Sequence, residues 1–306
     1  MRKSILKQLQ IACDITYSIP GLKQHLAPYR KNVPTDSLNF KDEFIVIKGG
    51  HKDRDVGIIG LVDFNNYIRK RYDILIAFKG TVGLLDWLND CKGVLVNSPY
   101  SKGKVHKGFL DSIRNLEEEM YEKVVELLKE SSNAKIYITG HSKGGALATL
   151  MAKFLINKNK KFKRKIKVVT FGSPRVGDKD FRSDYDVEHY RYESFWDLVP
   201  HLPFSEQECS LCEKVSDFFE KNPMLSDFMK LTPYTHVGEA RVFKKNKKRK
   251  LDKIDIKIDF ADCPLTDVVS EEELKSFVSL ISGIKLGTLP EIIDAHVFDY
   301  DDIDSM

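Results

Sequence analysis

The segment from Lys135 to Leu150, KIYITGHSKGGALATL, constrains the fold of this chain more than any other. Residues Ile136 to Thr139 have the composition of a short buried strand, and small and apolar residues with helical spacing follow Gly144. Between the two lies Gly140-His141-Ser142-Lys143-Gly144, a G-x-S-x-G sequence. A serine at such a strand-to-helix turn is strained and presents its hydroxyl, so the segment predicts a nucleophilic Ser142.

The neighbours of Ser142 fit this turn. Gly140 and Gly144 flank it, and the absence of side chains there permits a tight bend. Ser142 would lie at the N-terminus of the helix, where backbone N–H groups can bind an anion. The N–H of Lys143 is therefore expected to donate to the negative oxygen that forms when a carbonyl group is attacked. Glycine and serine are common residues, so this motif by itself is weak evidence. A nucleophilic Ser142 also needs a matching base, acid and second oxyanion donor elsewhere in the chain.

The order of expected strands and helices predicts an α/β fold. Continuous apolar runs at Asp73 to Phe78 and Ile166 to Phe171 indicate further strands buried on both faces, and Leu110 to Lys129 has helical periodicity. We predict a mostly parallel central sheet, covered by helices on both faces and bordered by antiparallel edge strands. The other expected strands are Phe44 to Ile47, Gly57 to Val62, His189 to Glu193, Arg241 to Phe243 and Lys253 to Phe260.

A single domain over residues 1–306 accommodates this order. Residues 4–17 place apolar side chains on one helical face and predict an N-terminal helix that packs on the domain. Residues from about 205 to 233 interrupt the pattern and predict a partly helical insert. A last helix is expected from Glu271 to Ile281.

Charge and cysteine content exclude several classes of protein. A net charge of +4 is too small to indicate nucleic acid binding, and five cysteines, an odd number, do not resemble a disulfide framework. We expect a cytoplasmic protein, because no signal peptide or membrane span is apparent, with peripheral contact at membranes or lipid droplets. Cys209-x-x-Cys212 lacks a second ligand pair, so no metal site is expected. No cofactor is expected either. The sequence leaves the oligomeric state unknown.

A serine nucleophile needs an imidazole to take its proton and a carboxylate to orient that imidazole. In this kind of turn the acid and then the histidine follow the serine along the chain. Asp197 comes just after the expected strand His189 to Glu193 and is the best acid. The alternative is that Asp197 only caps a turn or a helix.

Three histidines follow Asp197. His201 is too close along the chain to reach easily between Asp197 and Ser142. His236 precedes a strand and could serve as a core histidine, whereas His296 follows a long connection that gives it freedom to approach. The residues by themselves leave His236 and His296 both open as the base.

Several motifs in one order resemble the class 3, fungal-type triacylglycerol lipase family of the α/β-hydrolase superfamily. They are ILIAFKGT, DWLND, VHKGFLDSI, ITGHSKGGALA, VTFGSPRVGD, DLVPHLP, YTHVGEARV and a late Asp-x-His before a tyrosine. The resemblance implies Ser142 as nucleophile, Asp197 as acid and His296 as base. It also implies Thr81 as the oxyanion donor that joins the N–H of Lys143. His236 then matches the family's non-catalytic histidine.

The chain departs from the family pattern in two places. The family commonly has a short aliphatic residue at Lys143, and a cation is disfavoured at a helix N-terminus. Lys143 either pairs with an acid such as Asp86, meets an anionic group of the substrate, or is solvated. Tyr300 stands four residues after His296, where fungal members tend to have three.

Two segments carry alternatives for lipid contact. Val82 to Leu88 lies where fungal members have a lid helix, and it could equally be a fixed helix packed on the domain. Lys244 to Lys250, KKNKKRK, is expected at a hairpin tip, either as a solvated loop or as an attachment to anionic headgroups.

The expected function is a serine ester hydrolase that cleaves acylglycerol esters through an acyl-enzyme. A phospholipase A1 or lysophospholipase is one alternative. A catalytically silent lipase-like domain used in binding or signalling is the other. The sequence does not indicate acyl-chain length, positional selectivity or physiological substrate.

Overall fold

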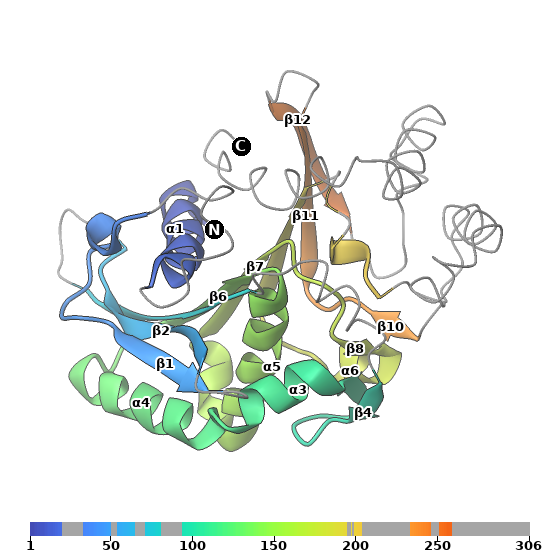
Figure 1. The fold of residues 1–306 in the computed structure, drawn as a ribbon, viewed down its shortest axis with the longest axis horizontal. Coiled ribbons are helices and arrows are strands. Elements are labelled where there is room, and N and C mark those ends of the chain that lie inside the picture. Colours follow the sequence, from blue (N-terminus) through green and yellow to red (C-terminus); the bar gives the residue numbers. More distant parts are fainter. Residues whose placement is uncertain are drawn as a thin grey trace.

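A computed structural model of the protein describes residues 1–19, 33–49, 54–64, 71–80, 94–194, 197, 199–203, 233–245 and 251–258. Within these ranges the chain forms a large sheet with helices on both faces and a small second sheet beside it (Figure 1). No helix in this part of the chain is long and apolar enough to cross a membrane.

The large sheet has eight strands in the order β1-β2-β3-β6-β7-β9-β11-β12. The five strands from β3 to β11 run parallel, while β1, β2 and β12 pair antiparallel at the two edges. This confirms the predicted sheet. The strands are β1 (Ile45–Gly49), β2 (Arg54–Val62), β3 (Asp73–Phe78), β6 (Ile136–His141), β7 (Ile166–Phe171), β9 (His189–Ser194), β11 (Glu239–Lys245) and β12 (Leu251–Ile258).

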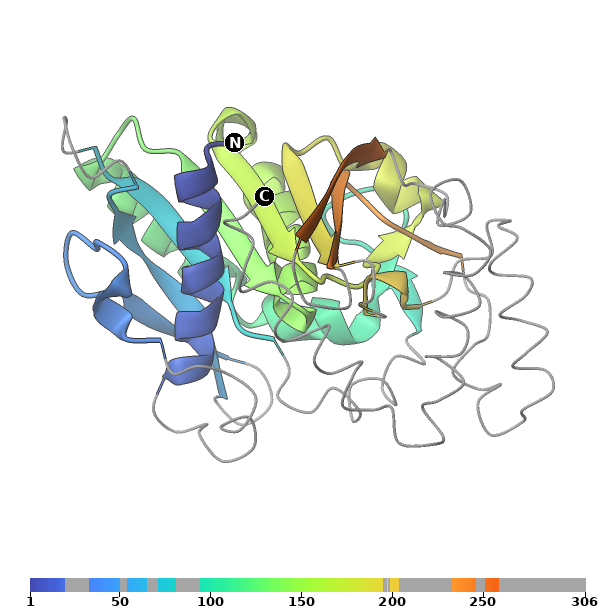
Figure 2. The ribbon, with the colours of Figure 1, turned by 90° about the horizontal axis from the view of Figure 1, so that it is seen from above.

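Helices cover both faces of this sheet, as predicted. Helix α1 (Lys3–Ser18) lies across one face, and α3 (Lys107–Arg114), α4 (Glu117–Glu130) and α5 (Lys143–Lys158) lie on the other (Figures 1 and 2). The burial of apolar side chains follows this division, with one core under α1 and a larger one under α3, α4 and α5. Burial against the sheet therefore explains the apolar face expected for residues 4–17.

The register of the parallel strands aligns their carboxyl ends. Phe78 of β3 lies opposite Gly140 of β6, and His141 lies opposite Phe171 of β7. Phe171 in turn lies opposite Tyr192 of β9. The segments that follow these strands therefore leave the sheet at one edge, where ligand sites of open α/β sheets form.

The structure corrects the expected helix from Leu110 to Lys129. The chain forms two helices there, α3 and α4, and α3 already begins at Lys107. Between them the N–H of Leu116 donates to the carbonyl of Ile113, a tighter i,i+3 turn. Apolar residues at i and i+3 continue through such a turn, so the periodicity does not reveal the break.

A second sheet was not expected from the sequence. It has the order β10-β8-β5-β4, with every pairing antiparallel. Its strands are too short to show an alternating pattern: β4 (Leu95–Asn97), β5 (Lys104–His106), β8 (Gly177–Asp178) and β10 (Tyr234–Thr235). The remaining described helices are α6 (Lys179–Asp184) and the 3-10 turns η1 (Thr35–Ser37), η2 (Lys160–Arg164) and η3 (Val199–His201).

Several expectations concern residues outside the described ranges. They are the helix at Val82 to Leu88, the insert at 205–233 apart from Pro233, and the last helix at Glu271 to Ile281. The hairpin expected around the basic run is confirmed, since β11 ends at Lys245 and pairs antiparallel with β12 from Leu251. Residues 246–250 of that run lie outside the description.

Candidate active site

Ser142 occupies a strained turn between β6 and α5. Its φ of 58° and ψ of −133° are outside the regions that a non-glycine residue ordinarily adopts. The Ser142 N–H donates to Phe171 O at 2.9 Å, and the Ser142 carbonyl accepts from Gly145 N at 2.9 Å. Strand β7 and helix α5 thus fix the backbone of Ser142 in the predicted strand-to-helix turn.

Two glycines make this turn possible. A Cβ at Gly144 would lie 2.3 Å from the carbonyl oxygen of Phe78, and a Cβ at Gly140 would lie 2.2 Å from the carbonyl carbon of Gly144. No side chain fits at these distances, because van der Waals contact begins near 3.4 Å. The flanking glycines therefore allow α5 to approach β3 and β6 closely.

We expect Ser142→Gly to be about 1 kcal/mol more stable to unfolding than Ser142→Ala. The positive φ costs a non-glycine residue on the order of 1–3 kcal/mol, and the larger unfolded-state entropy of glycine offsets roughly 0.5–1 kcal/mol of that gain. Urea unfolding of the two variants measures the difference. Both variants lack the hydroxyl, so their comparison isolates the backbone. A glycine variant less stable than the alanine variant would contradict the assignment of strain.

Helix α5 begins directly after Ser142. Lys143 is the first residue of the helix, and the Ser142 side chain makes no capping hydrogen bond to the described first turn. A serine before a helix ordinarily caps it, so this hydroxyl is kept for another use. The Lys143 side chain is half-buried. Asp86, its proposed partner, lies outside the described residues, so the role of this lysine stays a prediction.

Asp197 follows β9 and is completely buried. Its Oδ1 accepts from the N–H of Val199 at 2.9 Å, and its own N–H donates to Ser194 O at 3.0 Å. The carboxylate therefore does cap the short turn η3, which was the alternative to a catalytic role. A carboxylate accepts up to about four hydrogen bonds, so capping and orienting an imidazole are compatible.

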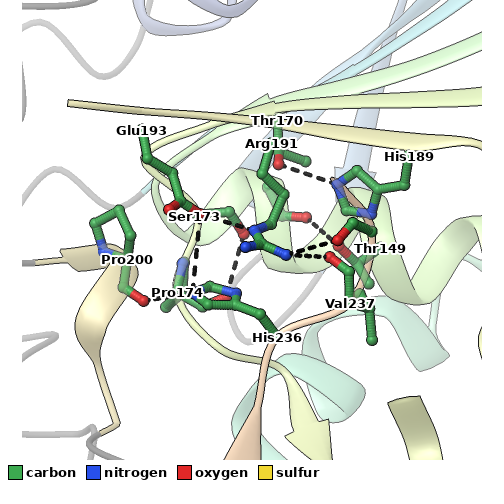
Figure 3. A network of polar contacts seen from close by, with 12 residues as sticks. Thr149, Thr170, Ser173, Pro174, His189, Arg191, Glu193, Pro200, His236 and Val237 are labelled. Carbon is green, nitrogen blue, oxygen red and sulfur yellow. Dashed lines mark hydrogen bonds and ion pairs between the residues drawn. The ribbon is translucent and has the colours of Figure 1, made fainter. Parts of the chain in front are cut away.

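A buried polar network joins β9 to the segments at Pro200 and Val237 (Figure 3). Arg191 Nε contacts Glu193 Oε1 at 2.7 Å, and its Nη1 donates to the carbonyl of Val237 at 2.6 Å. The Arg191 and Glu193 side chains are 2% and 9% exposed, so removing one partner would leave a buried charge at a cost of about 3–5 kcal/mol. The network joins β9, which leads into Asp197, to the segment that leads into β11.

His236 belongs to this network. Its Nε2 lies 2.6 Å from the carbonyl oxygen of Pro200 and 3.8 Å from Glu193 Oε1. A carbonyl oxygen only accepts, so Nε2 carries the proton in this contact. A general base needs an unprotonated nitrogen toward the serine. The contact therefore favours a structural role for His236, which anchors the Pro200 carbonyl, over a role as the general base.

The described structure contains two of the proposed triad residues, Ser142 and Asp197, together with Lys143 of the oxyanion pair. His296 and Thr81 lie outside the described residues, so their roles stay predictions. Among the described residues, no group of three or more histidine, cysteine, aspartate or glutamate side chains could hold a metal ion.

Sequence reasoning missed the Arg191–Glu193 pair. The two residues are separated by one position in a strand, so their side chains share one face of β9, where charges usually meet solvent. Opposite charges at i and i+2 of an expected strand were the available signal. The segment at Val237, which comes from 46 residues further along the chain, contacts Arg191 on that face, which is buried in the structure.

The site lies in a segment that resembles a known protein family. The model of the family described as "Lipase (class 3)" matches residues 75–207, the segment that contains the Ser142 turn and Asp197. This segment resembles the class 3 lipase family. A lipase from Rhizomucor miehei is 36% identical over 135 residues, 42% of this chain and 37% of the relative. Phospholipase A1-Igamma2 of Arabidopsis thaliana, a chloroplastic protein, is 34% identical over 164 residues, 44% of this chain and 31% of the relative.

The chain thus spans about a third of the length of these two curated relatives. Among solved structures, the triacylglyceride lipase of Rhizomucor miehei aligns with a TM-score of 0.60 at 24% identity. That alignment covers 85% of this chain and 86% of the other. It confirms the α/β-hydrolase fold.

Proposed function

We propose that the chain is a serine ester hydrolase that cleaves acylglycerol esters. The observation that carries the proposal is the strained Ser142 between β6 and α5, because such a turn presents a nucleophile at a helix N-terminus. The match of residues 75–207 to the class 3 lipase family and the buried Asp197 on the expected neighbouring segment support it.

In the proposed mechanism the Ser142 hydroxyl oxygen attacks the ester carbonyl carbon while the His296 imidazole takes its proton. The carbonyl oxygen becomes negative and accepts hydrogen bonds from the N–H groups of Lys143 and Thr81. The imidazolium, oriented by Asp197, then gives its proton to the departing alcohol and leaves an acyl-enzyme. Water attacks this ester in turn, with His296 again as the base, and releases the fatty acid.

The alignment of strand ends supports this assignment of roles. Gly80, which precedes Thr81, lies so near the turn that a Cβ on it would be 3.1 Å from Ser142 Cβ. The nearness of Gly80 to Ser142 supports the proposal that Thr81 supplies the second donor.

Phospholipase A1 activity is the second candidate. It rests on the similarity to the Arabidopsis phospholipase, which is nearly as high as that to the Rhizomucor lipase. Both reactions use the same acyl-enzyme chemistry, so the geometry of the turn at Ser142 does not distinguish the two activities.

A substrate series tests the proposal. We expect hydrolysis of short-chain p-nitrophenyl esters and of emulsified acylglycerols, with slower release of fatty acid from phosphatidylcholine vesicles. Fatty acid release is measured by titration at constant pH. Faster cleavage of the vesicles at the sn-1 position would assign phospholipase A1 instead. If no ester is cleaved and a fluorophosphonate fails to label the folded protein, the domain is catalytically silent.

A further inference from the structure

Tyr17, near the end of helix α1, contacts the residue beside the nucleophile. Its hydroxyl lies 3.1 Å from Nδ1 of His141, which directly precedes Ser142. The two rings are nearly perpendicular, with centroids 6.1 Å apart and an interplanar angle of 65°. A helix at the start of the chain, outside the matched family region 75–207, thus contacts the turn that bears the serine.

The same hydroxyl contacts the opposite wall of the site. A Cβ on Gly80 would lie 2.0 Å from Tyr17 Oη, 2.7 Å from the His141 carbonyl oxygen and 3.1 Å from Ser142 Cβ. Gly80 therefore packs directly between the tyrosine hydroxyl and the nucleophile turn. Any other residue at position 80 would push these two apart.

Lys79 completes the contact on that side. Its side chain is 7% exposed, and its Nζ lies 5.8 Å from the centroid of the Tyr17 ring. A cation over an aromatic face at this distance is attracted by the ring. Tyr17 accordingly touches both Lys79-Gly80, which lead into Thr81, and His141, which leads into Ser142.

Helix α1 is fixed well enough to act as a support for Tyr17. Leu9 and Ile15 on its inner face are completely buried against the sheet. Cys13 Sγ lies 3.4 Å from Thr139 Oγ1 of β6, the strand that ends at His141. The position of Tyr17 is thus tied to the strand that positions the nucleophile.

We propose that Tyr17 is a positioning residue that holds the turn at His141 and Ser142, and with it the N–H of Lys143, in place against Lys79-Gly80. This inference rests on the proposed function. A donor N–H acts at about 2.7–3.1 Å from the oxyanion, so a shift of this turn by a few tenths of an ångström weakens the hydrogen bond from Lys143. The Tyr17 hydroxyl contacts both His141 and Gly80 and so opposes that shift.

Tyr17→Phe tests the proposal, because it keeps the ring over Lys79 and removes the contact with His141 and Gly80. We expect kcat on a soluble p-nitrophenyl ester to fall about 3- to 10-fold, the worth of one hydrogen bond, with KM within about twofold. The rate of labelling by a fluorophosphonate is expected to fall by a similar factor. Urea unfolding checks that the variant is folded under the assay conditions.

Tyr185→Phe is a matched control. Tyr185 Oη also lies 3.1 Å from a histidine Nδ1, that of His189. Burial lowers the pKa of His189 well below its usual value and raises that of Tyr185, so both groups stay neutral near pH 7. His189 pairs with Val168 in the first half of β7, away from the strand ends at Ser142. Loss of the Tyr185 hydroxyl is expected to lower the free energy of unfolding and to leave kcat within about twofold of the wild-type value.

The outcomes separate the two proposals. A Tyr17→Phe enzyme with wild-type kcat and labelling rate would overturn the positioning role while leaving the proposed function intact. An equal loss of kcat in Tyr185→Phe would also overturn it, because the effect would then follow general stability. A wild-type protein that neither cleaves esters nor reacts with the fluorophosphonate would overturn the proposed function and this inference together.

Discussion

Ser142→Ala is expected to reduce ester hydrolysis by at least ~10⁴-fold and to abolish labelling by a fluorophosphonate. The reason is chemical, since an alanine methyl group cannot form the acyl-enzyme on which both reaction steps depend. Initial rates on a p-nitrophenyl ester and gel-based detection of the labelled protein measure the two effects. Stability is expected to change little, because the Cβ at the strained position is retained.

The control for this prediction is a serine on the next loop of the same edge. Ser173 follows β7, is buried, and donates through its hydroxyl to the carbonyl of Pro174 at 3.3 Å. Ser173→Ala is expected to keep labelling at Ser142. If Ser142→Ala were still labelled while Ser173→Ala were not, the nucleophile would be misassigned and the strained turn would have a structural purpose alone.

The second large effect is expected for His296→Ala, which should lose at least ~10⁴-fold in kcat, comparable to loss of the nucleophile. Removing the base leaves the Ser142 hydroxyl without a group to take its proton. His236→Ala, in contrast, removes the contact with the Pro200 carbonyl and leaves that buried group unsatisfied. It is expected to lose about 1–3 kcal/mol of stability and less than about tenfold in kcat.

Rates and urea unfolding of the two histidine variants separate these roles. His236→Gln serves as an additional control, because its amide can donate to the Pro200 carbonyl but cannot act as a base. We expect this variant to recover part of the stability lost in His236→Ala. If His236→Ala were folded but inactive and His296→Ala active, the base would be His236 and the predicted triad would be wrong in its third member.

Local pattern was sufficient for most of the fold. The apolar runs of β3, β6 and β7 are buried on both faces, and this environment is the reason for their continuous hydrophobicity. The serine turn was readable because glycine is required wherever a helix approaches a strand closely, and Gly140 and Gly144 mark that requirement in the sequence. Asp197 follows a strand, and this place in the sequence is what proposes it as the acid, a role that stays a prediction.

What the pattern did not contain depends on contacts between distant segments. The strands of the second sheet have two or three residues each, too few for periodicity to register. The residues by themselves left His236 and His296 both open as the base, since a histidine's role depends on what its nitrogens contact. For His236 the contact with Pro200 spans 36 residues of sequence.

The sequence by itself determined the strand-turn-helix at Ser142, because that geometry follows from residues adjacent along the chain. Only the tertiary structure decided what surrounds the turn. Tyr17 reaches His141 across 124 residues, and Arg191 reaches Val237 across 46. Such contacts arise when the sheet brings strand ends to one edge and α1 packs across its face. The apolar periodicity of residues 4–17 predicts that packing, but it does not specify which polar side chains then meet.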